Sequence, residues 1–254
     1  MFDHPIFRAI WSSLLPENCL ICGNFFLGSG VCSICFSLLR SRLPPLCNKC
    51  GGRLNSTYQE TTCLECILKK PILDGFDAAF DYEPVAGILL RCAKSRSQSV
   101  LLERLLAEES LKSRLQSLQQ FDKVVVVPDR KRRYIQRGFS PVRMIGSMVS
   151  SELKIPLDKF ALSWCRDAPR QTGLSKAKRS KNLAGAFKAK DVSKLRLLLV
   201  DDVYTTGRTL NEAAKVLRRS GAEYVYGFTL CYRNGGLMSR PSQGSRNMPT
   251  FHPS

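Results

Sequence analysis

The sequence predicts an α/β protein in which a parallel sheet with helices on both faces follows a small cysteine-rich unit. Two apolar runs, residues 123–127 and 195–200, show no alternation, which is typical of strands buried on both faces. Helical patterns alternate with strand-like runs over residues 71–232, as expected for a parallel sheet. Four CxxC pairs are confined to the first 70 residues, where hydrophobic periodicity is weak.

The predicted elements follow in order along the chain. A strand at 76–82 is followed by helices at 84–94 and 100–118, the second strongly periodic in leucine, and by a strand at 123–127. A helix at 141–153, a strand at 195–200, a helix at 211–220 that Gly221 ends, and a strand at 224–230 complete the series. We therefore expect three parts: a cysteine-rich domain at 1–70 with a short N-terminal helix, a domain at 71–232, and a disordered tail at 233–254.

The charge of the chain indicates its partners. The formal net charge is +18, of which residues 1–70 carry +3 and the remainder +15, so phosphate-rich ligands or nucleic acid are favoured. No stretch reaches the roughly 20 apolar residues of a membrane-spanning helix. The first residues lack the basic flank and the long apolar run of a secretion signal. We expect a cytoplasmic protein without membrane insertion.

The CxxC pairs predict structural zinc. Each pair offers two thiolates on one tight turn, so four pairs supply one or two tetrahedral Cys₄ sites. The predicted ligands are Cys19, Cys22, Cys32, Cys35, Cys47, Cys50, Cys63 and Cys66. Gly23 and Gly51 allow a positive φ after the pairs. Spacing leaves open whether neighbouring pairs join or a cross-braced scheme forms. The scattered Cys92, Cys165 and Cys231 are interpreted as core residues.

A candidate binding site follows the second buried strand, in the segment LLLVDDVYTTGRTL at residues 197–210. The apolar run places Asp201 and Asp202 at the carboxyl edge of the sheet, where they can accept hydrogen bonds from a ribose diol or hold Mg²⁺ through water. The turn at 204–209 supplies threonines and a glycine before a helix, whose N–H groups can bind a phosphate.

This segment resembles the signature of class I phosphoribosyltransferases, which binds 5-phosphoribosyl 1-pyrophosphate (PRPP) with Mg²⁺. The resemblance implies a phosphoribosyltransferase-like fold, with Asp201 and Asp202 on the ribose hydroxyls as candidate catalytic residues. It also implies PRPP binding by the following turn, which comprises Thr205, Thr206, Gly207, Arg208 and Thr209.

The combination of elements narrows the family. Four CxxC pairs, then VVVVPDRKRRYIQRGF, then RQTGLSKAKRSKNLAGAF resemble the ComF/GntX family of bacterial competence-associated proteins over about residues 19–232. The family's middle pattern ends in Gly-Phe-Asn-Gln, whereas this chain has Ser140 and Pro141 in place of the amide pair. The resemblance implies a zinc ribbon, a cytosolic role in natural competence, and a competence helicase as a partner.

Two basic segments are candidate contacts for anions. The first, residues 129–143, follows a buried strand, where this fold places its pyrophosphate loop, and includes Arg130, Lys131 and Arg137. The second, residues 166–190, resembles the flexible loop that closes over PRPP, with Gln171 and Arg179 in the matching pattern. Dense like charges beside a phosphate site favour an anion, either pyrophosphate or a nucleic-acid backbone.

Two functions remain open on the sequence. One is a ComF-like protein that binds PRPP, or a related ribose 5-phosphate, and single-stranded DNA during transformation. The other is a phosphoribosyltransferase that uses an unidentified acceptor. A PRPP-responsive regulator is a third reading, but no DNA-reading helix pattern supports it. Phe2 stands where an N-terminal glutaminase would carry its cysteine, which excludes a complete amidophosphoribosyltransferase.

Overall fold

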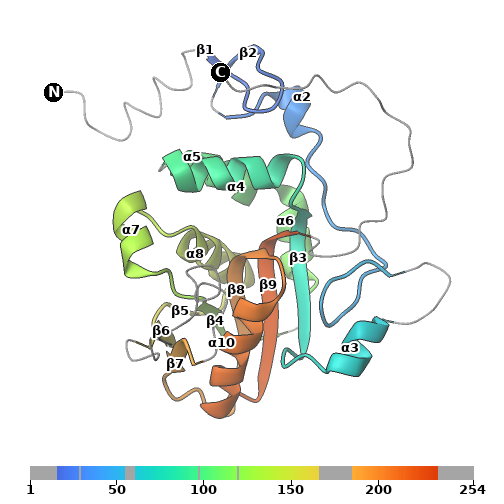
Figure 1. Ribbon diagram of the computed structural model, residues 1–254, viewed down its shortest axis with the longest axis vertical. Helices are drawn as coiled ribbons and strands as arrows, with labels where there is room; N and C mark the ends of the chain where they lie inside the picture. Colours follow the sequence, from blue (N-terminus) through green and yellow to red (C-terminus); the bar gives the residue numbers. More distant parts are fainter. Residues whose placement is uncertain are drawn as a thin grey trace, which may run out of the picture.

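The computed structural model describes residues 16–28, 30–54, 61–96, 98–118, 120–165 and 185–233, and its centre is a five-stranded sheet (Figure 1). The strand order is β3-β9-β8-β4-β5, and every neighbouring pair is parallel. The strands are β3 (Gly75–Asp81), β9 (Tyr224–Tyr232), β8 (Arg196–Tyr204), β4 (Lys123–Val126) and β5 (Leu157–Asp158). The predicted fold class is confirmed.

Helices cover both faces of the sheet. One face carries α4 (Val85–Arg96), α5 (Ser99–Leu106), α6 (Glu109–Gln116) and α8 (Pro141–Leu153), and the other carries α10 (Arg208–Arg219) (Figure 1). Leu198 and Val200 of β8 pack into the core of the first face, whereas Leu197 and Leu199 pack with α10. This division explains why the strand is apolar without alternation.

The prediction of one helix over residues 100–118 was wrong. The chain forms α5 and α6 instead, because Glu108 between them is extended, with φ −63° and ψ 128°. After the break the buried leucines of the two helices differ in part of their surroundings: α5 packs against α4 and α8, whereas α6 packs against α8 and β3. No glycine or proline marks the break, so the leucine periodicity concealed it.

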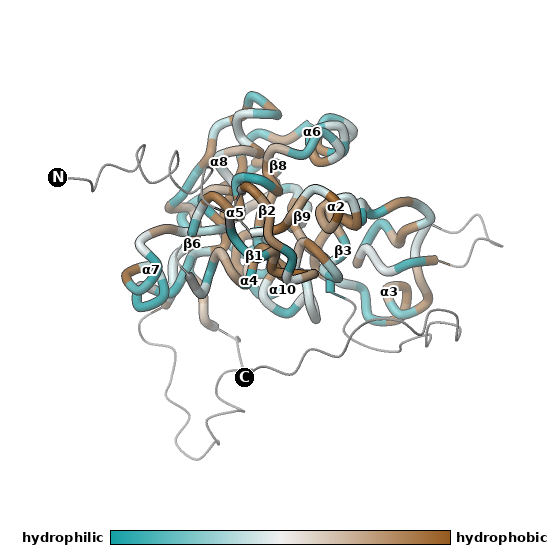
Figure 2. Tube along the Cα trace, turned by 90° about the horizontal axis from the view of Figure 1, so that it is seen from above, coloured by the Kyte–Doolittle hydropathy of each residue, from teal (hydrophilic) through white to brown (hydrophobic). Residues whose placement is uncertain are grey.

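Several short elements had no clear sequence signal. Strands β1 (Pro16–Asn18) and β2 (Phe25–Leu27) form an antiparallel pair, as do β6 (Leu162–Trp164) and β7 (Phe187–Ala189). Helices α2 (Ser33–Phe36) and α3 (Leu64–Lys69) each follow a cysteine. Helix α7 (Lys131–Arg137) lies on the opposite side of the molecule from α3 in both views (Figures 1 and 2).

The segment between the two halves of the cysteine-rich unit runs along β3. The N–H of Arg42 donates to the carbonyl of Ala79 at 3.0 Å, and the N–H of Asp81 donates to the carbonyl of Arg40 at 2.9 Å. Farther along, the N–H of Phe76 donates to the carbonyl of Asn48 at 2.8 Å. The outer edge of β3 is therefore hydrogen-bonded to residues 40–48.

The predicted N-terminal helix before residue 16 and the predicted tail, apart from Arg233, lie outside the described residues. Within the described ranges, no helix is both long enough and apolar enough to span a bilayer.

Candidate functional site

The carboxyl ends of the central strands border a cleft of about 490 Å³, the place where open α/β sheets bind ligands. The cleft brings together six of the twelve residues, cysteines apart, that the sequence singled out. These are Asp201, Asp202, Thr205, Thr209, Arg130 and Arg137. Thr206, Gly207 and Arg208 belong to the same turn but do not line the cleft. The side chain of Lys131 lies outside the described part of the chain.

The two acidic residues share one cationic neighbour. Lys94 of α4 places its Nζ 2.5 Å from Oδ2 of Asp202, and the N–H of Asp202 donates to Oδ1 of Asp201 at 2.8 Å. Burial and then the charge of Asp202 raise the pKa of Asp201 to about 8, although the Asp202 N–H and Lys94 oppose this shift. One lysine is insufficient compensation for two carboxylates, so the pair favours a hydroxyl donor or a bound cation.

Strand β8 extends farther than predicted. The sequence placed its end at Val200, but it continues to Tyr204 and pairs with β9 as far as Tyr204↔Tyr232. Pairing with β4 stops at Val126↔Val200. Asp201 and Asp202 are therefore strand residues with a ladder on the β9 side only. Aspartate is rare in strands, so the apolar run ended the prediction too early, whereas the pairing with β9 outweighs that preference.

The turn between β8 and α10 has the features of a phosphate site. We call residues 205–209 the phosphate loop. Gly207 precedes α10 with a φ of +69°, and a Cβ at this position would lie 2.5 Å from the Tyr204 hydroxyl oxygen. In the described part of the chain, no side chain caps the start of α10. Its first N–H groups are thus available to an anion.

The loop is anchored from α10. Asn211 Nδ2 donates to the carbonyl of Gly207 at 3.0 Å, and Asn211 Oδ1 accepts from the N–H of Ile72 at 3.2 Å. This side chain ties the loop to the segment before β3.

Three arginines line the same cleft as the acidic pair. We call Arg130, Arg133 and Arg137 the basic wall. The sequence predicted a basic loop here, but residues 131–137 of it form α7, which places Arg133 and Arg137 one turn apart along the cleft. Arg137 Nη1 lies 3.8 Å from Oδ1 of Asp129. The guanidinium carbon of Arg130 lies 4.6 Å from the ring centroid of Trp164, whose Nε1 donates to the carbonyl of Pro128 at 2.8 Å.

Ser140 and Pro141 begin α8. The Ser140 hydroxyl donates to a carboxylate oxygen of Asp129 and accepts from the N–H of Arg143 at 3.1 Å, and Pro141 occupies the first turn. Serine and asparagine are both favourable N-caps. The residue that replaces the expected asparagine therefore still caps this helix.

Only residues 185–190 of the second basic segment belong to the described part of the chain. Gln171 and Arg179 lie outside the described residues, so their predicted contact with a ligand stays a prediction. Strand β6 ends just before the segment and β7 lies near its end; the two strands pair at Trp164↔Phe187, with the N–H of Cys165 donating to the carbonyl of Ala186 at 2.8 Å. Trp164 lines the cleft and pairs with Phe187, so the residues before and after positions 166–184 lie beside the site.

Sequence reasoning missed several lining residues. Lys94 lies on α4, Trp164 on β6, and Tyr82 and Arg233 directly after β3 and β9, so they share no sequence pattern. The Arg233 guanidinium carbon lies 5.1 Å from the Tyr82 ring centroid. Arg133, by contrast, lies within the basic segment that the sequence had identified.

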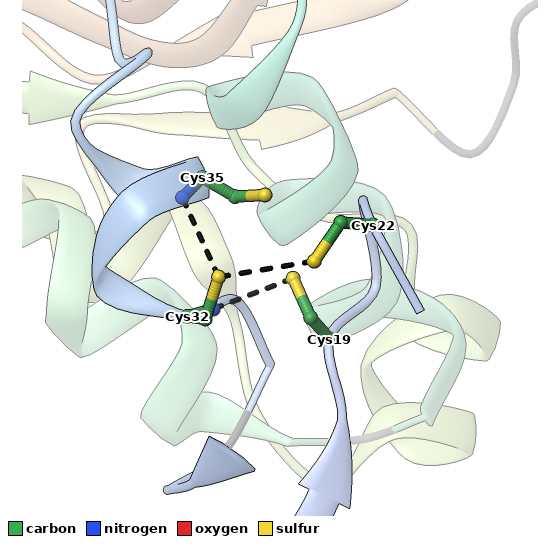
Figure 3. Close-up of side chains that lie close together, drawn as sticks. All are labelled: Cys19, Cys22, Cys32 and Cys35. Carbon is green, nitrogen blue, oxygen red and sulfur yellow. Dashed lines mark hydrogen bonds between the residues drawn. The ribbon is translucent and has the colours of Figure 1, made fainter. Parts of the chain in front are cut away.

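The cysteines form two clusters of four. Cys19, Cys22, Cys32 and Cys35 make the first cluster (Figure 3), and Cys47, Cys50, Cys63 and Cys66 make the second. Neighbouring pairs therefore join, and the cross-braced scheme is not adopted. All sulfur atoms within a cluster lie within 4.8 Å of one another, with Cys22–Cys32 at 3.9 Å and Cys50–Cys63 at 3.8 Å. A tetrahedron with Zn–S bonds of about 2.3 Å has edges of roughly 3.8 Å, so both clusters fit zinc.

The electrostatics of the clusters also fit a cation. Burial would raise the pKa of Cys19, but backbone N–H donors, including that of Cys32 at 3.4 Å, lower it to about 6. The same balance lowers the pKa of Cys47 to about 7, whereas burial raises that of Cys35 and of Cys50 to about 12. Four thiolates at these distances need a metal ion to ionise together.

The remaining cysteines do not join a cluster among the described residues. Cys231 is buried in the core, as predicted, whereas Cys92 and Cys165 are only partly buried.

Known protein families match both the cysteine-rich part and the α/β part of the chain. Residues 10–67 match the family described as the double zinc ribbon domain, and residues 143–243 match the phosphoribosyl transferase domain. The DNA utilization protein YhgH of Salmonella typhimurium is 33% identical over 85% of this chain and 97% of its own length. Competence protein F of Haemophilus influenzae is 32% identical over 82% and 93% of the two chains. Competence protein ComFC of Streptococcus pneumoniae is 25% identical over 84% and 99%.

Proposed function

This chain belongs to the ComF family of competence and DNA utilization proteins, and we propose that it binds PRPP with Mg²⁺ and handles single-stranded DNA during DNA uptake. The support for a role in competence or DNA utilization is the similarity over most of the chain. The support for PRPP is the geometry of the cleft. In this proposal the protein acts in the cytoplasm beside a competence helicase, an assignment that rests on family membership alone.

One observation carries the PRPP assignment: the acidic pair, the phosphate loop and the basic wall border the same cleft. Asp201 and Asp202 would accept hydrogen bonds from the ribose hydroxyls. Thr205, Thr209 and the first N–H groups of α10 would hold the 5′-phosphate. The pyrophosphate would lie toward α7, and Mg²⁺ between it and the carboxylates would neutralise the combined negative charge.

Calorimetry with Mg²⁺ and PRPP tests this assignment. We expect the native chain to bind, and Asp201→Asn/Asp202→Asn to lose binding. Glu103→Gln is the matched control, because Glu103 is an exposed carboxylate on α5 that does not line the cleft. No heat of binding in the native chain, or equal loss in the control, would overturn the assignment.

The DNA proposal rests on charge. Residues 71–254 carry a net charge of +15. Arg132, which is exposed on α7, lies next to the basic wall in sequence and extends its positive charge outside the cleft. Among the described residues, only Tyr82 and Trp164 supply rings to the cleft, and each is contacted by arginine, so this part of the chain offers few stacking platforms. The contact should therefore be electrostatic and steeply dependent on salt.

A salt series of single-stranded DNA affinity measures that contact. Arg133→Ala/Arg137→Ala should reduce the slope of log K against log salt by about 1.4, since each phosphate contact on a single strand contributes roughly 0.7. Arg219→Ala, exposed at the end of α10, should leave the slope nearly unchanged. A flat slope for the native chain would limit the basic wall to small anions.

Phosphoribosyl transfer is the second candidate. The observation that favours it is the position of Arg133 and Arg137, which would face a departing pyrophosphate and stabilise its charge. A pyrophosphate-release assay with PRPP against a panel of bases and DNA separates an enzyme from a binding protein. Release that needs one acceptor and disappears in Asp201→Asn/Asp202→Asn would establish transfer, and no release with any acceptor would leave binding as the function.

A further inference from the structure

The second cysteine cluster lies against an aromatic stack on the sheet. The turn after Cys50 brings Gly51, with a φ of +70°, so close to Phe76 that a Cβ at Gly51 would lie 2.8 Å from the ring. Arg42 donates from Nη2 to the carbonyl of Gly51, and its guanidinium carbon lies 3.7 Å from the ring centroid of Tyr232. The metal-binding turn is thus packed directly on Phe76 and Tyr232.

The stack continues to the phosphate loop. The rings of Phe76 and Tyr204 have centroids 4.4 Å apart, and those of Tyr204 and Tyr232 are 5.1 Å apart with an interplanar angle of 8°. The Tyr204 hydroxyl occupies the space that a Cβ of Gly207 would need. Tyr204 therefore contacts the stack on one side and the phosphate loop on the other.

The first cluster has different neighbours. Gly30, beside it in sequence, packs against Leu101 of α5, and Arg104 of α5 donates to the carbonyl of Val31. Cys19 and Cys35 join the apolar core on the α4 and α5 face. Among the described residues, none of these contacts reaches the cleft.

We propose that the second zinc cluster, acting through Phe76, Tyr232 and Tyr204, holds the phosphate loop in its ligand-binding shape, with Tyr204 as the positioning residue. Affinity for a ribose phosphate then depends on occupancy of the second cluster and not of the first. The affinity statement rests on the proposed PRPP binding, whereas the effect on the loop does not. Packed interiors transmit a displacement because they have few voids to absorb it.

The experiment compares Cys63→Ser with Cys32→Ser, which remove equivalent, partly buried ligands from the second and first clusters. Zinc content is measured by elemental analysis, amide hydrogen exchange is followed at residues 204–210 without ligand, and Mg²⁺·PRPP affinity is measured by calorimetry. We expect Cys63→Ser to lose one zinc, to accelerate exchange in the loop, and to weaken binding about tenfold. Cys32→Ser should lose one zinc and change neither property by more than about twofold.

Two further variants guard against simple unfolding of the zinc site. Tyr204→Leu should keep both zinc ions yet accelerate exchange in the loop and weaken binding. Tyr204→Phe, which keeps the ring, should have the same loop exchange and the same binding affinity as the native chain. Equal effects of the two cysteine variants, or unchanged loop exchange in Cys63→Ser and Tyr204→Leu, would overturn the proposal. If the native chain binds no PRPP, the proposed function fails, and the exchange measurements still decide the coupling.

Discussion

Replacing Gly207 by alanine tests the architecture of the phosphate loop. Two costs add at this position. The φ of +69° is unfavourable for an L side chain by about 1–2 kcal/mol. The new Cβ would also lie 2.5 Å from Oη, 2.8 Å from Cζ and 2.9 Å from Cε2 of Tyr204, an overpacking cost of about 1–3 kcal/mol. We expect Gly207→Ala to lower the free energy of unfolding by about 2–5 kcal/mol.

Gly138→Ala separates the two costs. Gly138 ends α7 with a φ of +73°, and a Cβ there meets nothing within 4 Å, so only the conformational cost of about 1–2 kcal/mol applies. Urea unfolding of both variants measures the difference, and calorimetry with Mg²⁺·PRPP should show lost affinity for Gly207→Ala alone. The reasoning is refuted if the two alanines destabilise the protein equally. Adding Tyr204→Leu to Gly207→Ala should recover part of the stability, because the nearest atoms are removed.

Three further changes have defined outcomes. Asp201→Asn should stabilise the ligand-free protein by roughly 3–4 kcal/mol more at pH 8 than at pH 5, as measured by thermal unfolding. The raised pKa of Asp201 makes its contribution to stability complete below the unfolded pKa near 4, and that contribution is lost as pH rises toward 8. The charged groups that face it are Asp202, Lys94 and Asp129. Arg42→Ala should cost about 3–5 kcal/mol in urea unfolding and Arg42→Met clearly less, because Arg42 is 1% exposed, its Nε has no partner among the described residues, and methionine refills the volume. A similar loss in both would contradict this account. Ser140→Ala should cost about 1 kcal/mol, and Ser140→Asn should retain most of the stability, if capping of α8 is what this position requires.

Long, strongly patterned elements could be predicted from the sequence. The bounds predicted for α8 are those observed, because Ser140 and Pro141 mark its start and apolar periodicity runs to its end. The sequence left two pairing schemes open for the cysteines, nearest-neighbour and cross-braced. The structure has the nearest-neighbour scheme. Helix caps, apolar periodicity and cysteine spacing involve residues close together in the sequence, so one sequence is enough to recognise them.

The errors arose where tertiary contacts outweigh local preference. Asp201 and Asp202 belong to a strand because β9 pairs with Asp201 and with Val203 on either side of Asp202, although aspartate disfavours strands. The break at Glu108 becomes visible only when α6 packs against α8.

Part of the cleft was equally hidden from the sequence. Lys94 and Arg233 are distant in sequence and share no motif, so only the folded chain brings them together. The acidic pair was found because it follows an apolar run and precedes a Thr/Gly turn, and the basic segment because its charges are densely clustered.

The segment at 40–48 has a consequence for the solubility of the protein. It joins the two cysteine clusters and occupies the hydrogen-bonding groups along the outer edge of β3. An edge strand that loses such a cover becomes a template for pairing with other chains. Chelation that releases either end of this segment would expose that edge while the sheet itself stays folded. The expected result is concentration-dependent aggregation of metal-depleted protein, through intermolecular strand addition at β3.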